Sequence, residues 1–508
     1  MALSRRDFLK LGVLATAGAT ACGQEWSNLP VFLPTPAGRP TTAPQPTPTL
    51  TPLPPPSREL KLLNRAGYGP RPGDLARAQQ MGFEAYLEAQ LNPESLDDSA
   101  LEGALGDLPV YSRPLAELVA MRDNRRAEML RDLSIVTLGS ALFSQRQLYA
   151  AMVEFWSDHF HIFIHKAPAL LPLKIVDDRE TIRPNALGKF RDLLTASVHS
   201  PAMLVYLDNA ANRRGAPNEN YARELLELHT LGVNGGYTQN DVSEAARILT
   251  GWTIPRRGAE GGPVRLSPDL HDKAAKSVLG QSFPADQGEQ DIQQLINLLA
   301  GHPATAQHLA TKLVRRFVAD EPPADLVSSV AQTFLATDGD IKAMLRVIFL
   351  SPTFAQAPPK LKRPYTFLAS ALRALAVRPG PESAIGEWLQ QLGQPLFAWP
   401  APDGYPDVGA AWMNYLLPRW SLALTLCDGT TPGLAVPWTT LERAVEATHT
   451  APLLDAYAQL LLHRPLDAGT LALFQDYVGS ERVDSAESQS RLRQCVALLL
   501  AGPAFQWM

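Results

Sequence analysis

The sequence is poor in cysteine, with only Cys22, Cys427 and Cys495 among its 508 residues. None of them belongs to a Cys-x-x-Cys pair, so thiolate zinc sites, iron–sulfur clusters and covalent c-type haem are not expected. Three cysteines also exclude a disulfide framework. One disulfide, between Cys427 and Cys495, is possible.

Long apolar runs, basic blocks and several catalytic motifs are also missing. No unbroken run approaches the roughly 20 apolar residues that a membrane-spanning helix needs. The formal net charge is −5, which argues against nucleic acid as the main partner. The chain contains no Gly-x-Ser-x-Gly, no His-Glu-x-x-His and no Gly-rich phosphate loop after a strand. These absences disfavour a typical serine hydrolase, a typical zinc protease and a doubly wound nucleotide-binding fold.

The first 21 residues have the pattern of an export signal. Adjacent Arg5 and Arg6 are followed by Asp-Phe-Leu-Lys and then by an apolar stretch from Leu11 to Ala21. This is typical of twin-arginine signals, and the stretch is too short to span a bilayer. We therefore expect export to the cell envelope.

Small residues directly before Cys22 resemble a bacterial lipobox, in which the cysteine becomes lipidated. The usual leucine at the start of the box is missing, and an ordinary cleavage site with a chance cysteine is the alternative. Residues 22–57 are rich in proline and threonine, so they predict an extended tether rising about 3.1 Å per residue. We expect a lipid anchor on the outer face of a membrane, with the tether lifting the folded body away from it.

Helical periodicity dominates from residue 58 to residue 508, with apolar residues three and four apart. The fold class expected is mainly α, a large helical-bundle-like body with at most a small β-hairpin near 262–282. That hairpin would pair Val264–Leu266 with Ser277–Leu279. The Pro- and Gly-containing stretch at 376–385 is a candidate internal boundary. Helices are expected, among others, over 72–91, 145–158, 222–231 and 304–318, with capping residues at Thr238-Gln-Asn-Asp241.

Several motifs together resemble the bacterial domain of unknown function 1800 family. The longest runs from Asn218-Glu-Asn-Tyr-Ala-Arg-Glu-Leu-Leu-Glu-Leu-His to Val233. Others are Leu62-Leu-Asn-Arg-Ala-Gly-Tyr-Gly-Pro70, Glu154-Phe-Trp-Ser-Asp-His-Phe160, His302-Pro-Ala-Thr305, Lys312-Leu-Val-Arg-Arg-Phe-Val318 and Trp412-Met-Asn414. The resemblance implies an exported protein without an established reaction, often found beside a second exported family. Where the family usually has Gly-Trp in a late loop, this chain has Gly404-Tyr405.

Two polar segments carry the candidate chemistry. In the first, a continuous helix would place Glu154, Asp158, His161 and His165 on one face, whereas an extended chain after Phe160 would place His159 and His161 together. Imidazoles and carboxylates suit zinc, iron or manganese. The alternative is a hydrated helix stripe with a core histidine.

In the second segment, Asn220, Glu224 and Glu227 share one helical face, and Arg223 can pair with Glu227. His229 lies too far round the helix to join that face, but in a last helical turn its protonated form would be favoured by the helix dipole.

These observations give the predicted site residues. We expect a divalent transition metal on Asp158, His159, His161, Glu224 and His229. The predicted catalytic residues are Glu224, Glu227 and His229, with a metal activating water and a glutamate acting as base. Weaker ligand-binding candidates are Asn220, Arg223, Trp252, His271, Asp272 and Trp399, against the alternatives of core packing for Trp252 and a surface turn for His271-Asp272.

Two functions follow from the sequence. The first is an envelope enzyme, hydrolytic or oxidative, with a histidine–carboxylate site. The second is a non-catalytic lipoprotein that acts as a scaffold or ligand-binding partner of another exported protein.

Overall fold

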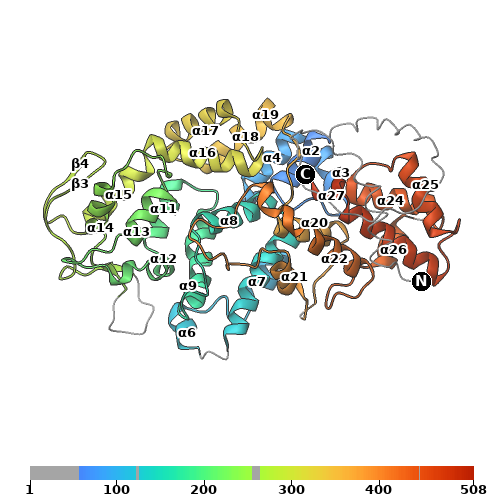
Figure 1. Cartoon of the computed structure of the whole chain (residues 1–508), viewed down its shortest axis with the longest axis horizontal. Helices are drawn as coiled ribbons and strands as arrows, with labels where there is room; N and C mark the ends of the chain where they lie inside the picture. Colours follow the sequence, from blue (N-terminus) through green and yellow to red (C-terminus); the bar gives the residue numbers. More distant parts are fainter. Residues whose placement is uncertain (1–55, 122–124, 255–263, 381, 446) are drawn as a thin grey trace, which may run out of the picture. The chain divides into compact units, whose positions relative to one another are not determined.

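The computed structural model describes residues 56–121, 125–254, 264–380, 382–445 and 447–508. The export signal with Arg5 and Arg6, Cys22, and nearly all of the predicted tether lie outside these residues. Arg58–Met508 form one compact unit, and the prediction of a mainly α fold is confirmed (Figure 1).

Short and medium helices build the first half of this unit. They are α2 (Arg58–Arg65), α3 (Asp74–Met81), α4 (Phe83–Leu91), α5 (Ser99–Gly106), α6 (Leu115–Ala120), α7 (Arg126–Phe143), α8 (Gln147–His159), α9 (Leu170–Val176), α10 (Arg183–Asn185), α11 (Phe190–Val198), α12 (Pro201–Tyr206), α13 (Asn220–Glu227) and α14 (Gln239–Ile248). A π-helical segment, η3 (Asp177–Ile182), joins α9 to α10. The expected helix over 72–91 is divided into α3 and α4, because Gly82 at φ 83° and ψ 152° leaves the helical region.

Longer helices form most of the second half. They are α15 (Glu289–Ala300), α16 (Pro303–Phe317), α17 (Ala324–Ala336), α18 (Ile341–Leu350), α19 (Pro352–Ala355), α20 (Pro364–Ala374), α21 (Ile385–Gln391), α22 (Leu416–Cys427), α23 (Trp438–Val445), α24 (Thr450–Leu462), α25 (Ala468–Val478), α26 (Ala486–Ala501) and α27 (Pro503–Gln506). A 3₁₀ segment, η5 (Gly409–Tyr415), precedes α22. Helix α17 packs against both α16 and α18, and α26 packs against α22, α24 and α25 (Figure 1).

Two small antiparallel sheets are present in the described residues, and their pairing differs from the predicted hairpin. Strand β1 (Trp252–Thr253) pairs with β2 (Arg265–Leu266), and β3 (Lys276–Val278) pairs with β4 (Gln281–Phe283). Leu279 and Gly280 both have positive φ, at 52° and 77°, which makes a tight two-residue turn between β3 and β4. The turn lets Ser277 pair within its own hairpin, so the expected pairing of 264–266 with 277–279 is wrong.

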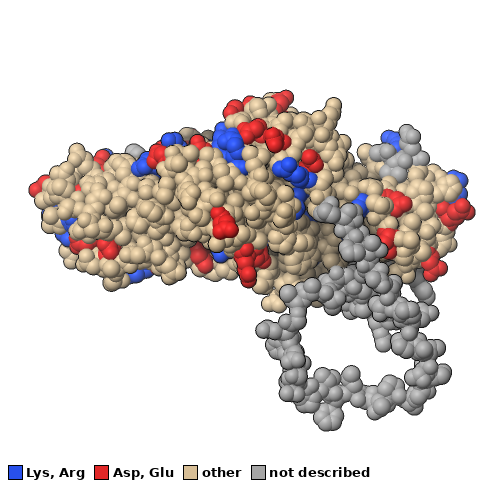
Figure 2. All heavy atoms as spheres, turned by 90° about the horizontal axis from the view of Figure 1, so that it is seen from above, with Lys and Arg blue, Asp and Glu red and all other residues tan. Residues whose placement is uncertain are grey.

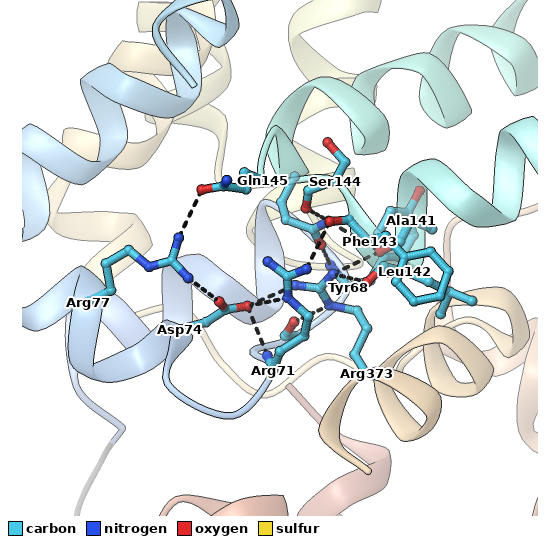
Figure 3. A network of polar contacts seen from close by, with 12 residues as sticks. Tyr68, Arg71, Asp74, Arg77, Ala141, Leu142, Phe143, Ser144, Gln145 and Arg373 are labelled. Atoms are coloured by element: carbon cyan, nitrogen blue, oxygen red, sulfur yellow. Dashed lines mark hydrogen bonds and ion pairs between the residues drawn. The ribbon is translucent and has the colours of Figure 1, made fainter. Parts of the chain in front are cut away.

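A buried arginine of α20, Arg373, holds the segment around Gly69 and Asp74 against the rest of the compact unit. Figure 3 shows Arg373 between Asp74 and the end of α7. Its Nη1 donates to the carbonyls of Ala141 and Leu142 at 3.0 and 2.8 Å, and its Nη2 pairs with Asp74 at 3.1 Å. Its Nε donates to the carbonyl of Gly69 at 2.7 Å. Because the last carbonyls of a helix lack intrahelical donors, this guanidinium caps α7 while it anchors that segment.

Charged residues are interspersed on the face seen in Figure 2, where basic and acidic side chains alternate without one large patch of a single sign. No helix in the described ranges is both long and apolar enough to cross a membrane.

Candidate functional site

Two helices face each other with charged residues at four-residue spacing. Helix α8 presents Glu154 and Asp158, and α16 presents Lys312 and Arg316. Arg316 forms an ion pair with Glu154 in which both side chains are largely buried. Lys312 lies one turn earlier on α16, and the negative charge of Asp158 raises the pKa of Lys312. Since residues four apart share a helix face, the two helices align carboxylates against cations in opposite chain directions.

Arg363 and Asp407 close the charged cluster from outside these helices. Arg363, just before α20, contacts Asp158 Oδ2 at 2.6 Å through Nη2 and Glu154 Oε1 at 3.4 Å through Nη1. Asp407 accepts from Arg316 Nη1 at 3.3 Å. Each buried carboxylate therefore has at least one guanidinium partner, which offsets part of its desolvation cost.

The loop that carries Asp407 is fixed against the end of α8 by a glycine. Gly404 has φ 74°, and a Cβ at this position would overlap the carbonyl oxygen of Asp158. The backbone N–H of the next residue, Tyr405, donates to the Asp158 carboxyl group. Glycine is required here both for the left-handed backbone and for the close approach. The Gly-Tyr pair thus positions Asp158, and aromatic packing of Tyr405 on Trp399 and Trp412 holds the loop.

A cavity of about 40 Å³ lies beside this cluster. Its lining includes both carboxylates of α8 and five aromatic ring side chains, Tyr68, His161, Tyr365, Phe397 and Tyr405. A water molecule needs roughly 10–15 Å³ of such space and several polar partners. The cavity can therefore hold water next to Glu154 and Asp158.

The pKa values of the central groups move toward neutrality. Burial raises the pKa of Asp158 to about 7, with Arg316 opposing the shift and Asp407 adding to it. Burial likewise raises the pKa of Glu154 to about 7, although Arg316 lowers it. Burial lowers the pKa of Lys312 to about 8, while Asp158, Asp407 and Asp403 raise it. Carboxyl and amine groups that titrate near pH 7 can give and take protons under ordinary conditions.

Three buried or half-buried histidines lie near Lys312, whose charge acts on all three rings. The ring centroid of His159 is 6.1 Å from that of His229 and 6.2 Å from that of His308. His159 Nε2 lies 3.1 Å from the His229 carbonyl oxygen, and His308 Nε2 lies 3.2 Å from that of Leu228. Both contacts require N–H at Nε2, so each Nδ1 carries a lone pair when the ring is neutral. Burial, followed by the positive charge of Lys312, lowers the pKa of all three rings, to about 3 for His229 and about 4 for His308.

The two predicted segments thus meet at His159 and His229, but the five predicted metal ligands do not converge. Helix α8 ends at His159, so the single face through His161 and His165 is not formed. His161 turns away and contacts the Trp399 carbonyl oxygen at 2.8 Å through Nε2. Asp158 is bound to Arg363. In the part of the chain that the structure describes, no group of three or more His, Cys, Asp or Glu side chains is arranged to hold a metal ion. These side chains therefore do not fit the metal site that the sequence suggested.

The predicted catalytic and binding residues of α13 lie beside the cluster. Glu224 is half-buried, and burial raises its pKa, with Glu227 and Asp403 contributing. Glu227 accepts from Tyr237 at 2.9 Å. Arg223 pairs with Glu219 at 3.1 Å, so its predicted pairing with Glu227 is wrong. Asn220 donates to the Leu207 carbonyl at 3.2 Å.

Protonation of His229 was also predicted wrongly. Helix α13 ends at Glu227, and the ring of His229 is fully buried with neither nitrogen hydrogen-bonded. Desolvation outweighs the helix dipole and keeps the ring neutral.

The remaining candidates have structural partners. Trp252 is buried and donates to the Val198 carbonyl at 2.8 Å, as core packing predicts. His271 is buried and contacts the Thr250 carbonyl through Nδ1 at 2.8 Å, so it is not a surface-turn residue. Asp272 pairs with Arg247 at 2.8 Å. Trp399 is partly exposed and donates to Asp403 at 2.8 Å, which keeps it at the edge of the cluster.

Sequence reasoning missed the cationic half of the site. His308, Lys312 and Arg316 recur every four residues on α16, and this spacing was a readable signal. Asp403 and Asp407 flank Gly404-Tyr405 in the late loop. Nothing in the sequence indicates that Arg363 reaches Asp158, because the two are 205 residues apart.

The fold and the cluster define a mainly α-helical protein with a buried carboxylate–lysine–histidine site. The chain belongs to the family described as "Protein of unknown function (DUF1800)", whose model matches residues 61–507. No curated protein and no solved structure matches the chain.

Proposed function

We propose that this chain is an envelope enzyme that performs general acid–base chemistry, of hydrolytic type, at Asp158 and Lys312. The supporting observation is the state of Lys312. It is only partly exposed, lies among Asp158, Asp403 and Asp407, and makes no hydrogen bond or ion pair within the described residues. Cations in such surroundings are normally paired, so an unpaired ammonium close to Asp158, which itself lines the cavity, is suited to contact a substrate.

The contacts of Asp158, Lys312 and Glu154 suggest a role in the reaction for each of these residues. Arg363 and the N–H of Tyr405 orient the Asp158 carboxyl group, which accepts a proton from cavity water as that water attacks. Lys312, as an ammonium, stabilises the negative charge that develops on the substrate and then protonates the leaving group. Glu154 stays paired with Arg316 and holds α16 in register with α8. Proton transfer by these residues favours the hydrolytic alternative.

A panel of small chromogenic compounds tests this role. Esters, phosphate esters and glycosides of 4-nitrophenol report hydrolysis without knowledge of the natural substrate. We expect turnover of at least one class, a bell-shaped pH profile, and a loss of about 10²- to 10⁴-fold in kcat for Asp158→Asn. The exposed Asp192→Asn serves as the matched control and should keep full activity. Equal rates in the wild type and in folded Asp158→Asn for every compound would exclude acid–base chemistry at this residue.

Location at the envelope is the second part of the proposal. It rests on the sequence pattern of Arg5 and Arg6, the lipobox-like residues before Cys22, and the Pro/Thr-rich tether. We infer that lipidated Cys22 anchors the enzyme to a membrane and that twin-arginine export delivers it folded.

A scaffold is the alternative function, and one observation favours it. Met413 and Leu417 are 47% and 67% exposed and lie four residues apart where η5 runs into α22. Exposed apolar pairs can dock a partner, here another exported protein. Loss of binding in Leu417→Glu, with Asp158→Asn unaffected in every assay, would support the scaffold.

A further inference from the structure

A second group of buried basic side chains lies in the C-terminal part of the unit. It consists of Lys362, two residues before α20, Arg419 of α22 and His463 at the end of α24. Lys362 is 4% exposed and Arg419 is fully buried. Helix α24 contacts both α20 and α27 here (Figure 1).

Aromatic rings and neutral acceptors surround the two cations. Lys362 Nζ lies 3.8 Å from the centroid of the Phe505 ring, and Arg419 Cζ lies 5.3 Å from that of Phe367. The two rings meet edge to face, with centroids 6.0 Å apart. Arg419 also donates to the Lys362 carbonyl at 2.8 Å through Nη2, which makes the two residues direct neighbours.

What this group lacks is a carboxylate. Neither Lys362 nor Arg419 has an ion-pair partner in the described ranges, and the Nε of Arg419 has no hydrogen-bond partner. Two buried lysines of this chain do have one: Lys174 pairs with Asp177 at 2.8 Å, and Lys276 pairs with Asp291 at 2.8 Å. Arg65 is buried without a carboxylate, but its guanidinium donates to four backbone carbonyls. Buried charges are normally paired, and arginine cannot escape by losing its proton.

We propose that Lys362 and Arg419 bind a small inorganic anion of the chloride type. Both side chains are buried among several elements, which excludes a large organic anion and leaves a small ion as the occupant. The ion supplies the missing negative charge between α20, α22 and α27 and stabilises the packing of the C-terminal helices. This site is independent of the acid–base cluster.

The titration behaviour of the group agrees with this proposal. Burial, and then the charge of Arg419, lowers the pKa of Lys362 to about 7. Burial, and then the charge of Lys362, lowers the pKa of His463 to about 4. No acidic residue raises either value, and a bound anion would do so.

Thermal unfolding of the full chain tests the proposal. At pH 6 and constant ionic strength, chloride replaces a bulky organic anion such as gluconate. The Tm of the wild type should rise by about 1–2 °C per tenfold increase in chloride, because ligand bound only to the folded state stabilises it. Lys362→Met should lose this dependence, and chloride NMR line broadening should disappear with it. The exposed Lys273→Met removes the same charge elsewhere and should behave as the wild type.

Two results would overturn the proposal. One is a Tm that responds to chloride equally in the wild type and in Lys362→Met. The other is a wild-type Tm that does not respond to chloride, whatever its dependence on pH.

Discussion

Gly404 carries two constraints at one position. Its φ of 74° disfavours any side chain, and its Cα faces the Asp158 carbonyl so closely that a methyl group would overlap it. Through this contact one residue sets where the late loop crosses α8, and therefore where the N–H of Tyr405 meets Asp158.

Substitution of this glycine should be costly. We expect Gly404→Ala to lower the free energy of unfolding by about 3 kcal/mol, the sum of left-handed strain and overpacking. Gly280→Ala is the matched control, since its φ is 77° and a Cβ there meets nothing within 4 Å. It should cost about 1–2 kcal/mol. Urea unfolding of both variants measures the difference, and equal losses would show that the contact with Asp158 contributes nothing.

Asp158 should also leave a signature in the pH dependence of stability. Its folded pKa of about 7 lies above the unfolded value of about 3.9, so folding takes up a proton between these limits. Its contribution is therefore most favourable below about pH 4 and is lost as the pH rises to 7. The difference in unfolding free energy between the wild type and Asp158→Asn should fall with pH across this window, by at most about 1.4 kcal/mol per unit.

Urea unfolding at pH 5, 6 and 7 measures this difference. Asp192→Asn, on an exposed residue, should run parallel to the wild type. If the free energy of unfolding of Asp158→Asn also runs parallel to that of the wild type across this pH range, the raised pKa of Asp158 is contradicted.

Part of the site was predictable at this scale. His159 and His229 were identified by the density of polar groups around them, and the structure places them together. Protonation of His229 and the convergence of the five metal ligands were mispredicted, because neither burial nor the direction of His161 can be read from spacing. Arg363 acts across 205 residues, and no local pattern encodes such a contact.

The element that organises the site is the α8–α16 pair. Arg316 of α16 pairs with Glu154 of α8 and with Asp407 of the late loop. Removal of Arg316 leaves these two carboxylates without their shared cation. We expect Arg316→Met to destabilise the protein by about 3–5 kcal/mol. Arg113→Met is the control, because Arg113 and Glu117 are 38% and 54% exposed and such pairs contribute less than about 1 kcal/mol.

Chemical denaturation gives both values. If Arg316→Met lowers the free energy of unfolding no more than Arg113→Met does, the ion pairs of Arg316 do not stabilise the fold.

Elements were predicted well where local chemistry decides them. Thr238 and Asp241 cap α14 as expected, and the structure joins them in a capping box. Predictions failed where a single residue interrupts a periodic run, as Gly82 does between α3 and α4. Strand pairing failed because the Leu279-Gly280 turn was not recognised.

At the scale of the whole molecule, the proposed anchor and the body should separate cleanly. We expect Cys22→Ala to move the protein from the membrane fraction to the soluble fraction without changing its Tm, because Arg58–Met508 form their own compact unit. Fractionation and thermal unfolding measure the two effects. Membrane association that persists in Cys22→Ala would rule out lipidation at this residue.

The two remaining cysteines bear on how such a protein can be made. Cys427 and Cys495 are both buried and both free, so no covalent crosslink between them holds α22 to α26. Maturation of the body then requires neither an oxidant nor a disulfide isomerase, and the same conformation is reachable on either side of a redox boundary. A body with this property can finish folding in a reducing compartment as well as in an oxidising one.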